Sequence, residues 1–232
     1  MLRKLLLVAG LLSSAAAHAD DTERDPWVAY NRPVFNFNMR LDRYVMKPIA
    51  TTYVDVMPGF AVTGIHNFFN NLGDVLVVLH DGLQGKGGQF GGDLLRLIVN
   101  TSFGVAGFID VGSRVGLPKH QQDLGITLGV WGVPSGPYVV LPFWGPSTLR
   151  DAPAGVFDLV LYPTYVIQPL SVQLAADGLY YVDERAALLP LQGSLDSNGD
   201  PYSLVREIYL QRRDVLIHGV PKSDPFTDDG GN

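Results

Sequence analysis

Residues 60–83 read FAVTGIHNFFNNLGDVLVVLHDGL, and this stretch decides the class of the fold. Apolar residues recur along it every three or four positions, at Val62, Ile65, Phe69, Leu72, Leu76, Leu79 and Leu83. That spacing places them on one side of an α-helix. The other side carries the small and polar residues Gly64, Asn67, Asn70, Asn71 and Asp74. The stretch therefore predicts a long amphipathic helix, which Gly73 is able to divide in two.

The following stretch, from about Asp93 to Ile109, predicts a helix that is apolar around most of its circumference. Its polar residues form one narrow stripe, Asp93, Arg96 and Asn100. A helix of this kind lies deep in a core or faces lipid. The stripe has two interpretations: it lines a wet passage, or Asp93 and Arg96 form an ion pair inside a core. We take the three residues as a candidate channel wall.

Upstream, the sequence predicts a first helix from Arg32 or Pro33 to about Lys47. One of its faces is apolar, and the other is polar and mostly cationic, with Arg32, Asn36, Arg40, Arg43 and Lys47. Four of these five residues are cations, although the chain has a net charge of −6. A basic amphipathic helix is typical of a membrane interface, but an ordinary helix packed on a core has the same pattern.

Downstream, the stretch from Leu124 to Leu149 carries no charged residue and is interrupted repeatedly by Gly and Pro, which excludes one continuous helix. Within it, only Tyr138–Leu141 reads as extended chain. Thr148 and Asp151 have the spacing of a capping box that opens a short helix. Bent backbone of this kind is tolerated at membrane depth beside protein or a water-filled cavity.

The rest of the chain also favours helices. Residues 159–176 and 179–191 predict two or three short helices, because Pro163 and Pro169 interrupt them. Asp200-Pro201 opens a last helix that ends near Gly219. The predicted class is all-α.

The composition bounds the function. Only 17% of residues are charged, against about 25% in an ordinary soluble domain, while 47% are apolar. The chain can therefore bury a core, and the low charge suits contact with hydrocarbon. Its net negative charge argues against a nucleic-acid partner.

The N-terminus has the form of a secretory signal. Arg3 and Lys4 precede an apolar run, which ends in Ala17-His18-Ala19. We expect a cleaved signal peptide at 1–19, one helical domain at 20–221 and a disordered acidic tail at 222–232. The sequence has no cysteine, so no site for acylation, and on this ground we predict that the protein is not a lipoprotein.

Motifs for catalysis or cofactors are missing from the sequence. The histidines form no H-E-x-x-H or other close metal pair, and the glycines at 82–92 match no phosphate-binding loop. The segment 132–136 fails the G-x-S-x-G pattern of a nucleophile elbow. We therefore predict no enzyme, no cofactor and no metal. An esterase, with Ser135 or Ser147 as nucleophile, is a weaker alternative.

Several short strings, taken together and in order, resemble the MlaA/VacJ proteins of the Gram-negative outer membrane. The strings are Asp25-Pro26-Trp27, Tyr30-Asn31-Arg32, 34–38 (VFNFN), 41–44 (LDRY), 67–72 (NFFNNL), 83–86 (LQGK), 127–133 (TLGVWGV), 136–142 (GPYVVLP), 145–151 (GPSTLRD), Asp200-Pro201-Tyr202 and 209–213 (YLQRR). Each string is weak alone, but the set spans nearly the whole mature chain and is specific.

This resemblance implies a ring of amphipathic helices in the inner leaflet of the outer membrane. The ring would enclose an amphipathic channel beside a short Gly/Pro-rich hairpin. Members of the family remove misplaced phospholipids from the outer leaflet, hand them to a soluble periplasmic lipid carrier (MlaC-like) and associate with trimeric porins. We thus expect an outer-membrane protein on the periplasmic side that maintains lipid asymmetry.

The resemblance also implies roles for particular residues. It places a gate beside the channel at Gly132, Val133, Pro134, Ser135, Gly136 and Pro137. The region of Asn36 and Phe37 would be a second control point, and the C-terminal helix would face the carrier. The main alternative is a soluble periplasmic protein that binds an apolar ligand or acts as a chaperone.

Overall fold

The computed structural model describes residues 25–193 and 199–219, and this part of the chain is mostly helical. In chain order its elements are α3 (Val28–Leu41), the π-helix η1 (Asp42–Met46), α4 (Lys47–Val56), α5 (Gly59–Leu83), α6 (Gly87–Phe103), α7 (Val111–Arg114), α8 (Leu124–Val130), β1 (Tyr138–Leu141), β2 (Gly145–Thr148), α9 (Asp151–Leu161), the 3-10 helix η2 (Pro163–Val166), α10 (Leu170–Ala187), the 3-10 helix η3 (Leu189–Leu191) and α12 (Pro201–His218). The all-α prediction is confirmed, with one small hairpin added. The predicted signal peptide and acidic tail lie outside the described residues.

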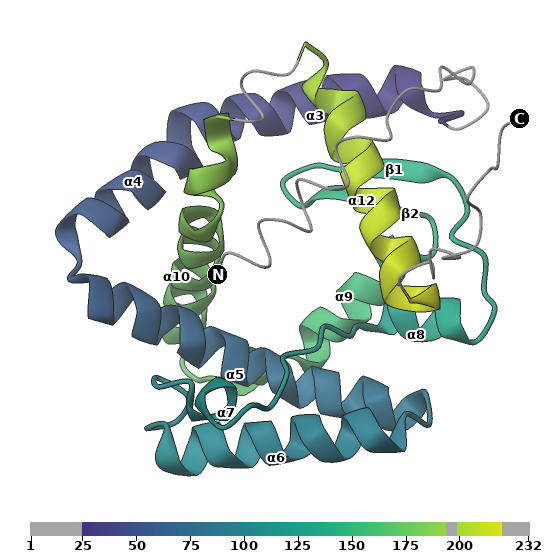
Figure 1. Ribbon diagram of the computed structural model, residues 1–232. Coiled ribbons are helices and arrows are strands. Elements are labelled where there is room, and N and C mark those ends of the chain that lie inside the picture. Colours follow the sequence, from purple (N-terminus) through teal and green to yellow (C-terminus); the bar gives the residue numbers. More distant parts are fainter. Residues whose placement is uncertain (1–24, 194–198, 220–232) are drawn as a thin grey trace, which may run out of the picture.

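The helices are arranged as a ring. In Figure 1, α3, α4, α5, α9, α8 and α12 follow one another around a central opening, and α6 lies outside α5. Contacts between α5 and α6, between α4 and α10 and between α8 and α9 hold neighbouring segments together. The predicted ring-like arrangement is confirmed. Among the described residues, no helix combines the length and apolar character needed to cross a bilayer.

One long bent helix forms a side of the ring. The predicted first helix, 32–47, is only its middle part, because α3, η1 and α4 run on without a break from Val28 to Val56. At 42–46 the helix has a π-turn, in which one extra residue is inserted and the helix bends. Pro48 comes two residues after this π-turn, inside the continuous helix, and its missing N–H removes one hydrogen bond from the helix there. Arg185 of α10 pairs with Asp42, its Nη2 lying 2.9 Å from Oδ2, and so ties this turn to the ring.

Both sides of α5 are partly buried, because Phe69 and Leu76 of the predicted apolar seam lie in the core together with polar residues of the opposite side. In α5, Asp74 and Asp81 are at most 1% exposed, whereas Leu79 and Leu83 of the predicted apolar seam are 43% and 45% exposed. Gly73 does not divide the helix. On α6, Ile98 is 50% exposed and the polar stripe is buried. Hydrophobic periodicity located both helices, but it did not show that their polar residues are buried as well.

The remaining sequence predictions differ mainly in their boundaries. The helix expected at 93–109 begins and ends earlier, as α6. The predicted short helices of 159–191 include one continuous helix of 18 residues, α10. The extended stretch at 138–141 is β1, which pairs antiparallel with β2. The backbone N–H of Asp151 donates to Thr148 Oγ1 at 3.1 Å as α9 begins, and the last helix is α12, as predicted.

A small apolar core joins α3, the hairpin and α12, with Phe35, Tyr138, Val140 and Tyr202. Asn31 is completely buried beside it. Its Nδ2 donates to Asp25 Oδ1 at 2.8 Å and to the Tyr138 carbonyl at 3.0 Å, while its Oδ1 accepts the Val140 N–H at 2.8 Å. One amide thus fixes β1 against α3.

Replacing Asn31 with alanine should destabilise the fold, because it leaves the Val140 N–H and the Tyr138 carbonyl buried without partners. Each such group costs about 1–3 kcal/mol. We expect Asn31→Ala to lower the free energy of unfolding by about 2–4 kcal/mol, measured by denaturant titration in detergent. Asn36→Ala, at an exposed position of the same helix, should change it by less than about 0.5 kcal/mol. Equal stability of the two variants would contradict the role given to Asn31.

Candidate functional site

The described surface is unusually apolar and the described interior unusually polar. Among the described residues, 18 polar or charged residues are buried, against 12 hydrophobic ones. Large apolar side chains are exposed on α9 and α10, among them Phe157 at 57%, Leu170 at 59% and Leu174 at 61%. A soluble domain does not leave so many large apolar side chains in contact with water. The exterior is therefore suited to a partly hydrocarbon surrounding.

A cavity of about 240 Å³ lies between the hairpin, α9 and α10. The hairpin and α10 stand on different sides of the opening in Figure 1, so the cavity belongs to the ring interior. Its lining is mainly apolar, with Leu141, Trp144, Pro146, Ala152, Gly155, Val156 and Leu159, and is polar at Ser147, Asp151 and Tyr181. A cavity of this mixed character suits an amphiphile.

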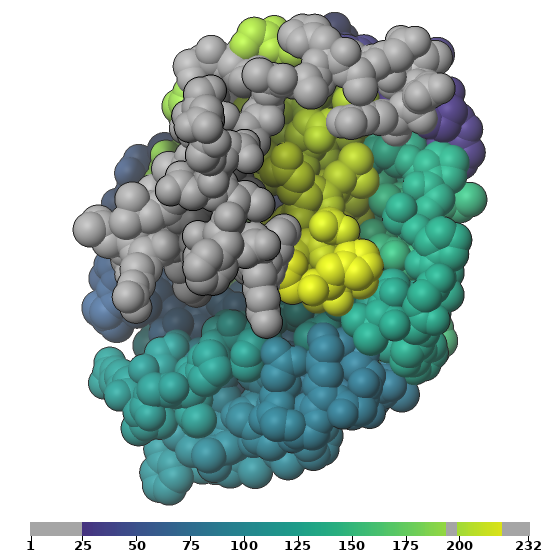
Figure 2. All heavy atoms as spheres, turned by 45° about the vertical axis from the view of Figure 1, so that its right-hand side comes forward, coloured from purple at the N-terminus to yellow at the C-terminus, as the bar shows by residue number. Residues whose placement is uncertain are grey.

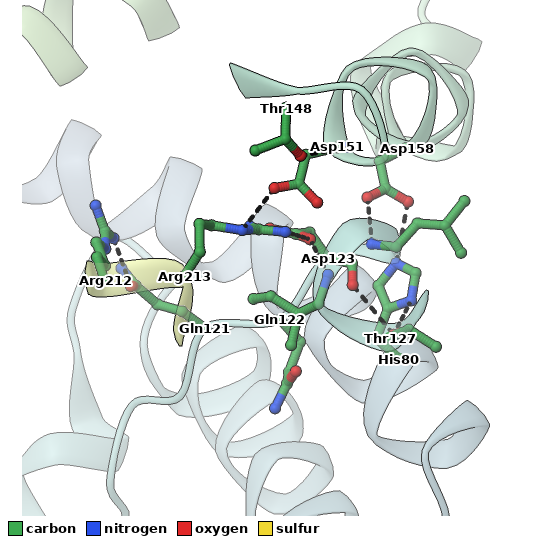
Figure 3. Close-up of polar contacts among 12 residues, drawn as sticks. His80, Gln121, Gln122, Asp123, Thr127, Thr148, Asp151, Asp158, Arg212 and Arg213 are labelled. Atoms are coloured by element: carbon green, nitrogen blue, oxygen red, sulfur yellow. Dashed lines mark hydrogen bonds and ion pairs between the residues drawn. The ribbon is translucent and has the colours of Figure 1, made fainter. Parts of the chain in front are cut away.

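Asp151 forms the charged floor of this cavity and is held by two arginines. Its Oδ1 accepts from Arg150 Nε at 2.7 Å, and its Oδ2 lies 3.0 Å from Arg213 Nε and accepts from the Tyr209 hydroxyl at 2.8 Å. Burial alone would raise the pKa of Asp151, but these partners hold it below its usual value. Arg213 also pairs with Asp123, so α8, α9 and α12 share one network (Figure 3).

A second network lies beside it at the junction of α5, α8 and α9 (Figure 3). The His80 ring is 1% exposed, with Nε2 3.0 Å from Asp158 Oδ1 and Nδ1 3.1 Å from Thr127 Oγ1. The other oxygen of Asp158 accepts the Leu124 N–H, which begins α8, at 2.7 Å. These contacts hold the lower right side of the ring in Figure 1 together.

The predicted gate segment, 132–137, comes directly before the first strand of the hairpin and is not part of either strand. The strands are 138–141 and 145–148, and the turn between them is at 142–144. Arg150 holds the segment, because its guanidinium donates to the Val133 carbonyl and its backbone N–H to the Ser135 carbonyl, both at 3.1 Å. Gly136 has a φ of +66°, and a Cβ there would lie 3.1 Å from Leu149 Cβ. The segment is therefore fitted closely to 149–150.

The predicted interfacial residues are largely accessible on the long helix. Asn36, Phe37, Arg40 and Arg43 are exposed, and Lys47 is half-buried. The Phe37 ring also meets Phe143 of the hairpin turn edge to face, with centroids 5.4 Å apart. Its neighbour Asn38, which the sequence analysis missed, donates to the Leu141 carbonyl and accepts the Phe143 N–H, both at 2.9 Å.

The predicted channel wall is wrong in its location. Asp93, Arg96 and Asn100 are only 1%, 3% and 3% exposed, so they face no open passage. Arg96 Nη2 donates to Asp110 Oδ1 at 2.8 Å, and Asn100 Oδ1 accepts the Gly112 N–H at 2.7 Å. The stripe is buried, as its core interpretation expects, but the ion pairs differ: Asp93 pairs with His120, and Arg96 pairs with Asp74 and Asp110.

Sequence reasoning missed a polar cluster where α4, α5 and α10 meet. His66 Nδ1 lies 2.7 Å from Asp183 Oδ2, and the Tyr53 hydroxyl donates to Asp183 Oδ1 at 3.2 Å. The pKa of the adjacent Glu184 is raised, mainly because surrounding protein partly desolvates its carboxyl group, and the charges of His66 and Arg212 oppose this rise. His66 and Asp183 are 117 residues apart, so no local motif signals this cluster.

The buried carboxyl groups of Asp81 and Asp93 make the stability of the fold depend on pH. Burial, a hydrogen bond to Asp93 and the charge of Asp93 raise the pKa of Asp81 to about 6. In the ionised form both Asp81 oxygens are buried without a donor. The unfolded chain therefore loses this proton at lower pH than the folded chain, and stability falls as the pH rises from about 4 to 6.

Asp81→Asn should remove this pH dependence. At pH 4 the variant and the parent chain should unfold alike, and at pH 7.5 the variant should be more stable by about 1–3 kcal/mol. Thermal unfolding in detergent at the two pH values measures the difference. Asp55→Asn, at an exposed site on α4, should show no such pH-dependent gain. A variant that is less stable than the parent at pH 7.5 would contradict the assigned protonation.

Comparison with known proteins gives the family. The model of the family described as MlaA lipoprotein matches residues 23–216. The chain belongs to the MlaA family. It is 38% identical to the "Intermembrane phospholipid transport system lipoprotein MlaA" of Escherichia coli K12, over 97% of this chain and 92% of that protein. The protein of the same name from Haemophilus influenzae is 30% identical, over 96% and 94% of the two chains.

A solved structure has the same fold as this MlaA-family chain. It is described as "Structural basis for maintenance of bacterial outer membrane lipid asymmetry" and matches with a TM-score of 0.73 and 35% identity. The match covers 83% of this chain and 98% of the other. The similarity therefore extends over the whole ring rather than one helical hairpin.

These comparisons correct the prediction that the protein is not a lipoprotein. The family model and the MlaA relatives all carry the word lipoprotein in their descriptions. The prediction rested only on the absence of cysteine from the sequence, which remains a fact of this chain. It is withdrawn, and the chain is a member of an outer-membrane-associated lipoprotein family.

Proposed function

We propose that this protein transports phospholipids at the Gram-negative outer membrane and so maintains lipid asymmetry. The observation that carries the proposal is the mixed cavity in the ring, set in a chain with an apolar exterior. Its MlaA relatives are named for intermembrane phospholipid transport, and the matching solved structure concerns outer-membrane lipid asymmetry. Lipids misplaced in the outer leaflet would enter the ring and leave on the periplasmic side.

The proposed mechanism needs no covalent step. Exposing an acyl chain to water costs about 0.8 kcal/mol per methylene, so moving two chains through water would cost well over 10 kcal/mol. Side chains such as Val156 and Leu159 offer the acyl chains an apolar surface, while Ser147 and Asp151 offer the headgroup polar contacts. Both parts of the lipid thus keep suitable partners along the path. We accordingly propose a transporter rather than an enzyme.

We further propose two partners from the family resemblance. A trimeric porin would hold the ring in the membrane through the exposed apolar faces, and a soluble periplasmic lipid carrier would receive the lipid. Segment 132–137 would act as the gate, since Arg150 connects its carbonyls with the cavity floor at Asp151. The exposed Phe37 would control the same region through its contact with Phe143 of the hairpin turn.

The soluble-protein alternative makes a different prediction about the exterior. A soluble ligand-binding protein or chaperone needs a polar outer surface, whereas Phe60 and Val166, on separate elements of the ring, are 75% and 79% exposed. Fractionation of the cell envelope distinguishes the two. We expect the protein in the outer-membrane fraction, and recovery in the soluble fraction without detergent would favour the alternative.

Filling the cavity should block transport. Gly155 lines the cavity and has open space where a Cβ would stand, so Gly155→Phe should fill it without displacing backbone. We expect surface-exposed phospholipid to rise to the level of a deletion strain, measured by chemical labelling of the outer leaflet. Gly91→Phe places the same ring at an open helical glycine of α6 that does not line the cavity, and should have normal lipid distribution.

A bulky residue at Gly136 should disturb the gate. Gly136→Val combines a strained positive φ with a close contact to Leu149, so we expect altered outer-leaflet phospholipid while the protein stays folded and in place. Gly116→Val is the matched control, because Gly116 has a φ of +85° and open space around its missing Cβ. Unchanged lipid distribution in Gly136→Val, or an equal change in both variants, would remove the gating role from this segment.

A further inference from the structure

The cluster where α4, α5 and α10 meet contains three side chains that could bind one metal ion. His66 comes from α5, and Asp183 and Glu184 are consecutive residues of α10. One ligand atom from each lies within 4.8 Å of the other two, and His66 Nδ1 and Asp183 Oδ2 are only 2.7 Å apart. Ligand atoms around one zinc ion stand about 2.0–2.2 Å from the metal, so roughly 3–4 Å from one another. Small side-chain rotations would bring the three atoms to that spacing.

The carboxylates of Asp183 and Glu184 lie close together although the two residues are neighbours on one helix. Consecutive residues of an α-helix point about 100° apart around its axis, so neighbouring carboxylates normally diverge. Here both reach the same imidazole, because α10 packs against α5 and α4. The three donors therefore come from two helices, and an ion bound to them would join α5 to α10.

A positioning group and an open side complete the arrangement. The Tyr53 hydroxyl donates to Asp183 Oδ1 at 3.2 Å, which leaves Oδ2 for the site and fixes the orientation of the carboxylate. Such hydrogen bonds to a ligand are a regular part of metal sites. The Asp183 side chain is 1% exposed, but that of His66 is 39% exposed and Glu184 is exposed, so an ion has a route from solvent.

We propose that His66, Asp183 and Glu184 bind a divalent transition-metal ion of the zinc type. An imidazole nitrogen with two carboxylates suits zinc and similar ions, whereas calcium and magnesium prefer oxygen ligands throughout. Two carboxylates supply the negative charge that the ion needs. Three protein ligands leave a fourth position for water. A bound ion would replace the His66–Asp183 hydrogen bond and hold the corner of the ring.

Zinc titration of the whole purified chain tests the proposal directly. The chain should carry no polyhistidine tag, be treated with a chelator, and be titrated with Zn²⁺ in detergent by calorimetry. We expect one Zn²⁺ per chain in the parent protein. His66→Gln and Glu184→Gln should each weaken binding at least about 10-fold, and Tyr53→Phe, which keeps all three ligands, by about 10-fold or more.

A second histidine–carboxylate pair provides the control. His218 Nδ1 lies 2.8 Å from Asp214 Oδ1 on the exposed face of α12, and this pair has no third ligand in the described structure. His218→Gln should therefore bind Zn²⁺ like the parent chain. Parent binding no tighter than that of His66→Gln, or an equal loss in His218→Gln, would overturn the site. Circular dichroism before titration verifies that each variant is folded.

The same samples separate this proposal from the proposed function. The zinc site does not depend on lipid transport, and its readout is the stoichiometry and affinity of Zn²⁺ alone. Intact lipid asymmetry in a His66→Gln strain, together with lost Zn²⁺ binding in vitro, would support a metal site that transport does not require. Intact transport with no Zn²⁺ binding by the parent chain would overturn the metal site only.

Discussion

The ring depends on polar side chains that find their partners inside the protein while apolar side chains face outward. A buried polar group without a partner costs about 1–3 kcal/mol, and an unpaired buried charge costs more. Paired groups meet this constraint at many positions: Asn31 bonds to two strand backbone groups, and Arg96 bonds to Asp110, whereas the ionised Asp81 carboxylate has no donor. Because the pairs connect different elements, polar contacts contribute to the shape of the ring together with the small apolar core.

A ring with a polar interior can contain a cavity of mixed polar and apolar lining. A protein with an ordinary apolar core has no room for an amphiphile, because its interior is closely packed. Here α9 leaves apolar side chains accessible: Val156 lines the cavity, and Phe157 is 57% exposed. At the polar floor the two cations Arg150 and Arg213 are balanced by the two carboxylates Asp151 and Asp123, so the network carries no net charge.

The sequence was sufficient to predict the helices but not which of their polar residues are buried. The spacing from Val62 to Leu83 located α5 within a residue, since periodicity depends only on helix geometry. Whether a polar residue is buried depends on partners from other elements, such as His120 for Asp93 and Asp110 for Arg96, which the pattern of one helix does not show. The His66–Asp183 pair could not be predicted at all, because it forms across 117 residues when α10 returns to α5.

A single residue, Arg150, couples segment 132–137 to the cavity. Figure 2 shows α12 against the segment that includes α8 and the hairpin, and contacts of α12 with α8 and β2 hold it there. Arg150 stands at this junction, with its guanidinium between the Val133 carbonyl and Asp151. Movement of segment 132–137 must therefore break a bond to Arg150 or move the cavity floor with it. Since Asp151 is also held by Arg213 of α12, any opening of the cavity is connected to the C-terminal helix.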